Sequence, residues 1–102
     1  MPRLAHSVYF TLHDPAPANI VALVAACNKY LTVQPGIHFY GAGTCIMELD
    51  RPVNDRDWHV ALHVVFESRQ MHDDYQVDPT HQIFIAENKA TWAKVRVFDA
   101  YI

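Results

Sequence analysis

Residues 58–66, WHVALHVVF, decide the fold, because no other segment carries so strong a strand signal. Apolar, largely β-branched residues recur in it with a period of two, which is the spacing of side chains on one face of a strand. We therefore predict a strand over 58–66. One face carries Val60, Leu62, Val64 and Phe66, and the other carries His59, Ala61, His63 and Val65.

The segments before this strand predict two further strands and one helix. Residues 6–12 alternate as a strand whose apolar face begins with His6. In residues 19–31, apolar side chains recur at spacings of three and four, which predicts an amphipathic helix. Pro35-Gly36 ends this helix, and residues 37–40 then predict a strand that loosens at the glycines following it.

The loop over residues 48–57 is polar, carries both signs of charge and contains a proline. We predict that it connects two strands and that it is the place for a lid over a site.

The segments after residues 58–66 predict two helices and a last strand. Ser68 is a good N-cap for a short helix in which Met71 and Tyr75 lie one turn apart. Asp78-Pro79 supplies an N-cap followed by proline at the first helical position, which predicts a helix from about residue 80 to 93. Residues 95–101 alternate again as a strand. The inner face of the longer helix would carry His81, Phe84, Ile85, Asn88 and Trp92.

This order of elements predicts the fold class. It matches the split βαββαβ arrangement of ferredoxin-like folds. The predicted order is strand, helix, strand, strand, short helix plus helix, strand. We therefore predict an α+β sandwich, with a four-stranded antiparallel sheet and helices on one of its faces. At 102 residues, the chain has room for a single domain spanning residues 1–102.

The sheet face opposite the helices is predicted to be too apolar to stay in water. A second copy of the chain is the simplest cover, so we predict a homodimer in which two open sheet faces pack together as a closed barrel by two-fold symmetry. The predicted open face carries Ser7, Tyr9, His38, Tyr40, Ala61, His63, Val65 and Phe98.

Composition argues against several classes of partner. The net charge is −3, from 8 basic and 11 acidic residues, and the basic residues form no cluster that would neutralise phosphates. We expect no nucleic-acid partner. No apolar run approaches the ~20 residues that span a bilayer, and the N-terminus lacks a signal core. We therefore expect no membrane partner, a cytoplasmic location, and reduced Cys27 and Cys45.

His6 and His81 are the leading candidates for chemistry, since both are predicted to point into one apolar core. His81 can act as a general base, because an imidazole changes protonation state near neutral pH. Tyr75 can donate to a developing enolate, and His6 can orient His81 or hold a substrate carbonyl. This set suits proton abstraction next to a carbonyl or an intramolecular condensation, and the chemistry needs no metal or redox cofactor.

A structural interpretation of the same three residues remains open. In it, His81 bonds a backbone carbonyl at the helix start, His6 bonds a neighbouring side chain, and Tyr75 packs with its hydroxyl at the surface.

Other groups predict no site. His59 and His63 would lie ~13 Å apart on a strand, too far to share one zinc ion. The run His72-Asp73-Asp74 points in different directions on a helix and is interpreted as a solvated face. Cys27 lies in an apolar helical stripe, which favours a core role over a nucleophile.

Taken together, these motifs resemble the stress-responsive A/B barrel domain family, called Dabb, among the dimeric α+β barrel proteins. The resemblance covers nearly the whole chain. It is carried by His6 and its strand, Pro35-Gly36, Gly43, Val64-Val65-Phe66-Glu67-Ser68, Tyr75, Asp78-Pro79-Thr80-His81 and Val97-Phe98-Asp99.

The resemblance implies a homodimer with a cavity between each sheet and its helices, lined by His6, Tyr75 and His81. These three match polar residues of the polyketide-cyclase branch of the family. The chain departs from the family's usual His-Pro-x-His signature at Asp78, which stands in place of the first histidine. It departs from the cyclase branch at two positions, where Cys27 stands in place of a tyrosine and Val60 in place of a histidine, with His59 one position off.

Our functional hypothesis is a homodimer that binds a hydrophobic, carbonyl-bearing small molecule, with cyclase-like acid–base chemistry. The alternatives are a non-catalytic stress-associated dimer and a cofactor-independent monooxygenase.

Overall fold

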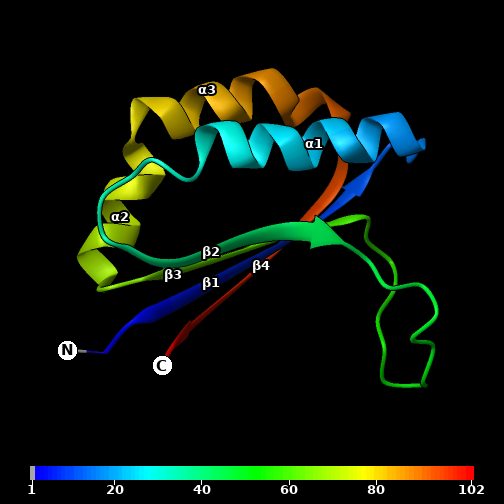
Figure 1. Ribbon diagram of the computed structural model, residues 1–102, viewed down its shortest axis with the longest axis horizontal. Coiled ribbons are helices and arrows are strands. Elements are labelled where there is room, and N and C mark those ends of the chain that lie inside the picture. Colours follow the sequence, from blue (N-terminus) through cyan, green and yellow to red (C-terminus); the bar gives the residue numbers. More distant parts are fainter. Residues whose placement is uncertain (1) are drawn as a thin grey trace.

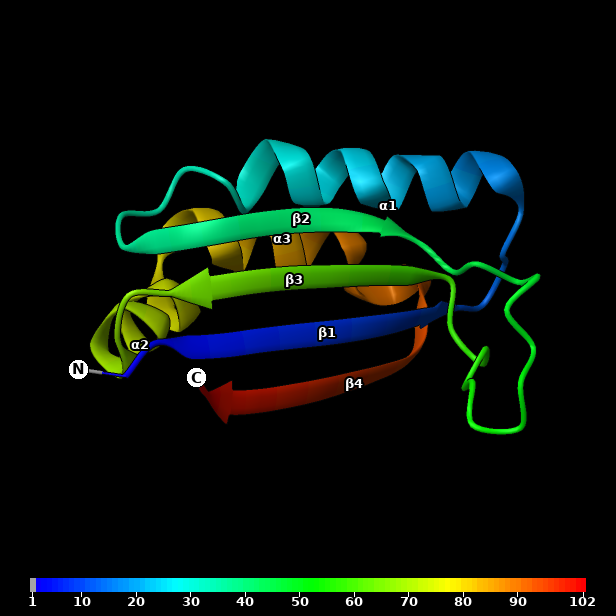
Figure 2. The same cartoon turned by 60° about the horizontal axis from the view of Figure 1, so that its bottom comes forward.

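The computed structural model describes residues 2–102 and shows a four-stranded antiparallel sheet with helices on one face (Figure 1). The strands lie in the order β2-β3-β1-β4, which Figure 2 shows face on. The predicted α+β ferredoxin-like fold is confirmed. In chain order the elements are β1 (Leu4–Leu12), α1 (Pro17–Tyr30), β2 (Ile37–Thr44), β3 (Val60–Phe66), α2 (Arg69–Val77), α3 (Pro79–Asn88), a 3-10 helix (Lys89–Thr91) and β4 (Trp92–Tyr101).

The core lies between the sheet and the layer formed by α1 and α3 (Figure 1). In β1, buried and partly exposed residues alternate along the whole strand, as the period of two in the sequence predicts. The inward residues of β1 and β3 meet Leu23 and Cys27 of α1 and Phe84 of α3. Burial of these apolar side chains is the main source of stability for this arrangement.

Two predicted helix caps form as expected. The Ser68 hydroxyl accepts a hydrogen bond from the Met71 backbone N–H at 3.3 Å, at the start of α2. The Asp78 carboxylate accepts from the backbone N–H groups of Thr80 (2.9 Å) and His81 (3.3 Å), at the start of α3. These bonds satisfy donors that a helix start leaves unpaired, and they fix the position of His81.

The predicted end of the second long helix is wrong by about five residues. The helix α3 ends at Asn88, a 3-10 turn follows, and β4 already begins at Trp92. The side-chain amide of Asn88 donates to the Phe84 carbonyl at 2.8 Å and satisfies one of the last free acceptors of the helix. Trp92 pairs with Leu12 of β1, so tertiary strand pairing overrides the helical periodicity. Trp92 still faces the core, with its ring 4.9 Å from that of Phe10.

The predicted orientation of Tyr40 is also wrong. The pairing of β2 with β3 shifts register between Ile37 and Phe39, which is a β-bulge. The extra residue turns Tyr40 to the helix side, where its hydroxyl donates to the Asn28 side chain at 2.8 Å. Phe39 lies on the open face instead and is 56% exposed.

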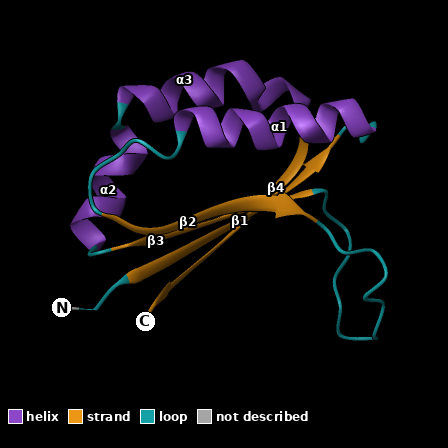
Figure 3. Cartoon of the chain, in the orientation of Figure 1, coloured by secondary structure: helices purple, strands orange, loops and turns teal. Residues whose placement is uncertain are grey.

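The long connection between β2 and β3 folds toward the open face of the sheet, at one end of the molecule (Figure 3). The side chains of Asp55 and Asp57 accept hydrogen bonds from Arg96 and Lys94 of β4, each at 2.7 Å. The ring of Trp58 lies 5.0 Å from that of Tyr9. Within residues 2–102, no helix is long and apolar enough to cross a membrane.

Candidate active site

The fold brings the three predicted site residues together. His6 comes from β1, Tyr75 from α2 and His81 from α3. The Tyr75 ring is 6.1 Å from the His6 ring and 4.5 Å from the His81 ring, measured between centroids. All three side chains belong to buried residues.

These residues line a cavity of about 160 Å³ between the sheet and the pair α2 and α3. Its remaining walls are mainly apolar and include Phe84 and Trp92. Val95 and Val97 line the cavity from β4 and are 39% and 51% exposed. The cavity therefore opens along the β4 edge of the sheet. A hollow with apolar walls and a few convergent polar groups is the usual form of a small-molecule site.

Three polar atoms of this cavity's lining residues lack a hydrogen-bond partner among residues 2–102. They are the Tyr75 hydroxyl, His81 Nδ1 and Trp92 Nε1. Buried polar groups are normally paired, because an unpaired one costs about 1–3 kcal/mol. The structural interpretation does not account for these three atoms, whereas a ligand with polar groups would supply partners for them.

The protonation states around the cavity follow from burial. Burial lowers the pKa of His81, and the nearby His6 lowers it further, so the imidazole is neutral at pH 7. Burial also lowers the pKa of His6, although Asp99 opposes this effect. Burial raises the pKa of Tyr75, so its hydroxyl keeps its proton. The site thus combines two neutral imidazoles with a phenol that can donate.

Asp99, which the sequence places only in the family motif Val97-Phe98-Asp99, is a further candidate site residue. It pairs with His6 across β1 and β4, and its Oδ1 lies 2.5 Å from His6 Nδ1. A carboxylate in this position accepts the Nδ1 proton and leaves Nε2 as the lone-pair nitrogen of His6. Only the register of β1 with β4 reveals this pair, because His6 and Asp99 are 93 positions apart in the sequence.

Several other candidates lie outside the cavity. Cys27 is a fully buried free thiol whose pKa burial raises to about 12, which makes it a poor nucleophile. His59 accepts a hydrogen bond from the Leu12 backbone N–H, and His63 bonds the Ser7 hydroxyl on the open face.

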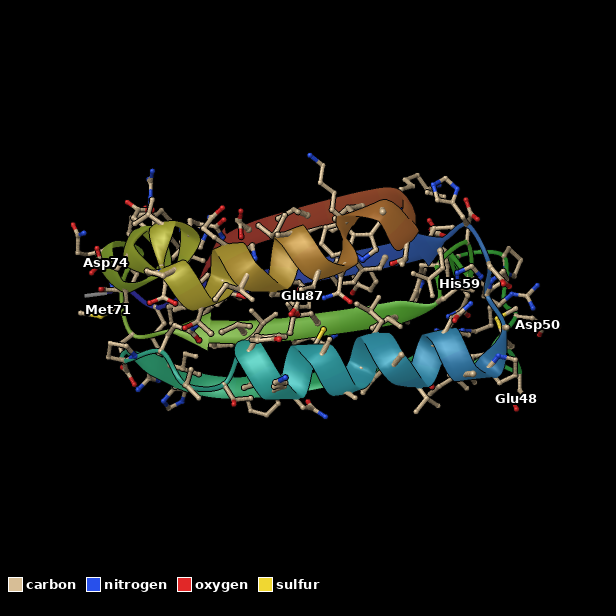
Figure 4. All side chains as sticks on the ribbon, turned by 90° about the horizontal axis from the view of Figure 1, so that it is seen from above. Glu48, Asp50, His59, Met71, Asp74 and Glu87 are labelled. Carbon is tan, nitrogen blue, oxygen red and sulfur yellow. The ribbon has the colours of Figure 1, made fainter. Side chains whose placement is uncertain are left out.

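The loop over residues 48–57 contributes no lining residue to this cavity, so the expectation of a lid there is not met. Figure 4 shows its residues Glu48 and Asp50 at the end of the molecule opposite Met71 and Asp74 of α2.

The sheet order, the helices on one face and the cavity beneath them define a ferredoxin-like α+β protein. The sequence model described as "Stress Responsive A/B Barrel Domain" matches residues 4–102. The chain therefore belongs to the Dabb family.

Solved structures with low sequence identity share this fold. A Dabb family protein from Mesorhizobium loti has a TM-score of 0.79 and 20% identity, over 98% of this chain and 96% of that chain. A dimeric ferredoxin-like protein of unknown function from Thermobifida fusca has a TM-score of 0.80 and 17% identity, over 99% and 92%. A hydroxynitrile lyase from Passiflora edulis has a TM-score of 0.77 and 19% identity, over 98% and 93%. The sequence matches none of the curated proteins with which it was compared.

Proposed function

We propose that this chain forms a homodimer and that each protomer binds a small hydrophobic carbonyl compound in the cavity of His6, Tyr75 and His81, where it catalyses acid–base chemistry. The observation that carries the proposal is that three residues lining one mainly apolar cavity each hold a buried polar atom with no hydrogen-bond partner among residues 2–102. The lyase among the structural neighbours is consistent with small-molecule chemistry on this fold.

The size of the cavity limits the ligand. An apolar cavity of about 150 Å³ in another protein holds one benzene molecule. The cavity here, about 160 Å³, therefore fits a single ring, and the opening at Val95 and Val97 leaves room for a substituent. One-ring aromatic ketones and aldehydes that carry a C–H bond on the carbon next to the carbonyl are the matching class.

The donors and acceptors suit proton abstraction next to a carbonyl. The Tyr75 hydroxyl and the Trp92 N–H donate to the carbonyl oxygen. The lone-pair nitrogen of neutral His81 takes a proton from the adjacent carbon, and the C–H electron pair forms the C=C bond of an enolate. Charge then builds on the oxygen, where the two donors stabilise it. Return of the proton from His81 completes the cycle without any net redox change.

The test of binding is thermal shift with a panel of one-ring aromatic ketones and aldehydes, in the wild type and in Tyr75→Phe. Tyr75→Phe keeps the ring and removes only the unpartnered hydroxyl, so we expect the free protein to lose little stability but the ligand-induced shift to fall by at least half. Tyr30→Phe is the matched control, because the Tyr30 hydroxyl donates to Glu87 at 2.7 Å and lies outside the cavity. Figure 4 shows Glu87 between α1 and α3.

The test of chemistry is deuterium uptake at the carbon next to the carbonyl of a bound ketone in D₂O, followed by NMR. We expect the wild type to accelerate uptake and His81→Gln to slow it by at least 100-fold, since general-base contributions are about 10²–10⁴-fold. Binding without uptake would reject the acid–base part and leave a binding protein. No stabilisation by any compound would reject the whole proposal in favour of the non-catalytic dimer.

A further inference from the structure

Three side chains with metal-binding groups meet at one end of the sheet, beside the cavity. They are His6 of β1, Asp99 of β4 and His72 of α2. One nitrogen from each imidazole and one carboxylate oxygen all lie within 4.8 Å of one another. The His6 and His72 ring centroids are 5.2 Å apart. Tyr75 and His81 do not belong to this group, and His6 is the one residue that it shares with the cavity of the proposed function.

The distances suit a single ion after small side-chain movements. Metal–ligand bonds of ~2.0–2.2 Å to nitrogen and oxygen place neighbouring ligand atoms ~3–3.5 Å apart. The two imidazoles come from β1 and α2, and the Asp99 side chain, which is 42% exposed, would turn from its hydrogen bond with His6 Nδ1 to become a ligand. Ligands that come from strands and helices are held more firmly than ligands on loops.

His72 is oriented as a metal-binding histidine usually is. Its Nδ1 lies 3.0 Å from Asp73 Oδ1. When the Nδ1–H group donates a hydrogen bond to this carboxylate, the free lone pair of the ring is on Nε2. The side-chain amide of Gln76 lies 3.4 Å from Nε2, which agrees with a lone pair there. Arg69 in turn holds Asp73 at 3.2 Å. A carboxylate behind the imidazole fixes its tautomer and its ring orientation.

The group is also accessible. His72 and Asp99 line a second hollow of about 200 Å³, which Arg69 and Tyr101 border. His6 lines the first cavity, so an ion at this point would lie between the two hollows. Three protein ligands leave at least one coordination position for water or a small anion on the open side.

We propose that His6, His72 and Asp99 bind one divalent transition-metal ion in each protomer. Two imidazoles and one carboxylate form a donor set that takes Zn²⁺ and Fe²⁺ in proteins, whereas Mg²⁺ and Ca²⁺ prefer oxygen ligands alone.

The experiment is calorimetric titration of Zn²⁺ into tag-free, chelator-treated protein, with Co²⁺ absorption in the visible range as a report on coordination. We expect one ion per protomer. His72→Gln and Asp99→Asn each remove a ligand and are expected to weaken binding at least 100-fold. Asp73→Ala removes the carboxylate behind His72 and should weaken binding by about 10- to 100-fold. His13→Ala is the matched control, because His13 is an exposed histidine outside the group and its loss should change nothing.

The outcomes separate this site from the proposed function. Tyr75→Phe should still bind the metal ion but bind the aromatic ligand more weakly. His72→Gln should bind the metal ion more weakly but still bind the aromatic ligand. Zinc binding that persists unchanged in both His72→Gln and Asp99→Asn would overturn the site, and so would the absence of binding to the wild type. Circular dichroism establishes that each variant is folded. If His72→Gln does not fold, Asp99→Asn decides the matter, because the Asp99 side chain is half-exposed.

Discussion

At the scale of single residues, the two buried histidines make stability depend on pH. Burial lowers the pKa of both His6 and His81 in the folded chain, whereas both titrate near 6.5 in the unfolded chain. As pH falls below about 6.5, the unfolded chain takes up protons that the folded chain does not. The stabilising contribution of His6 and His81 is therefore complete above pH 6.5. It is lost as the pH falls toward the pKa values of these histidines in the folded chain.

This predicts a slope in the free energy of unfolding in the window just below pH 6.5, the ordinary pKa of histidine. Each histidine contributes at most about 1.4 kcal/mol per pH unit, so His81→Gln should reduce the slope by up to that amount. Urea unfolding at a series of pH values and a fixed protein concentration measures this slope. NMR titration of the His81 ring protons gives the pKa of His81 directly. Carboxylates such as Asp78, whose pKa the Gln34 amide lowers, titrate below this window. An unchanged slope in His81→Gln would show that its imidazole is not held neutral by the fold.

At the scale of elements, the turn before β2 packs directly on α2. Gly36 has φ of 81°, and a Cβ there would lie 2.7 Å from Met71 Cβ. Gly36→Ala would add backbone strain of about 1–2 kcal/mol to an overpacking cost of about 1–3 kcal/mol. We expect a loss of about 2–5 kcal/mol in the free energy of unfolding, measured by urea denaturation.

Gly43→Ala is the control for this substitution. No atom lies within 4 Å of a Cβ at Gly43, and its φ is not positive. Alanine there should change stability by less than about 0.5 kcal/mol. Equal losses in the two variants would show that the turn does not pack on α2 as described.

The elements that sequence patterns predicted well are those fixed by local rules. The strand predicted over residues 58–66 and the caps at Ser68 and Asp78 need no knowledge of distant contacts. Both caps form, and the strand forms over Val60–Phe66, two residues shorter than predicted at its start. Patterns failed where tertiary pairing decides. The start of β4 at Trp92 depends on Leu12, and the bulge that turns Tyr40 inward depends on pairing with β3.

The same distinction applies to the site. His6 and His81 could be named because each lies on the inner face of an element whose period is clear, whereas the resemblance to the Dabb family implied that Tyr75 lines the same cavity. Asp99 and His72 could not be grouped with His6, since along the chain His72 neighbours Asp73 and Asp74 rather than its partners in space. The group depends on strand register and on where α2 crosses the end of the sheet.

At the scale of the whole molecule, the sheet face opposite the helices is exposed to solvent in the single chain. It carries exposed Phe39 and Phe98 together with Tyr9, whose ring lies 5.9 Å from that of Phe98. Apolar side chains on a broad, flat face favour association of two sheets. Solved relatives of this fold are described as dimeric. The cavity lies on the opposite side of the sheet, among the helices, so a dimer formed through the open face would leave its mouth free.

This predicts that Phe98→Arg breaks the dimer. An arginine at a buried interface position is an unpaired charge, and its desolvation costs several kcal/mol, so we expect the dissociation constant to rise at least 100-fold. Sedimentation equilibrium over a series of protein concentrations measures the change. Val21→Arg is the matched control, because Val21 is 68% exposed on α1, away from the open face. It should leave the dimer intact.

A wild type that stays monomeric at every concentration would contradict the dimer, and a dimer that tolerates Phe98→Arg would place the interface elsewhere. Because the cavity and the proposed interface occupy opposite faces of the sheet, folded monomeric Phe98→Arg should still bind the aromatic ligand, which separates the two proposals.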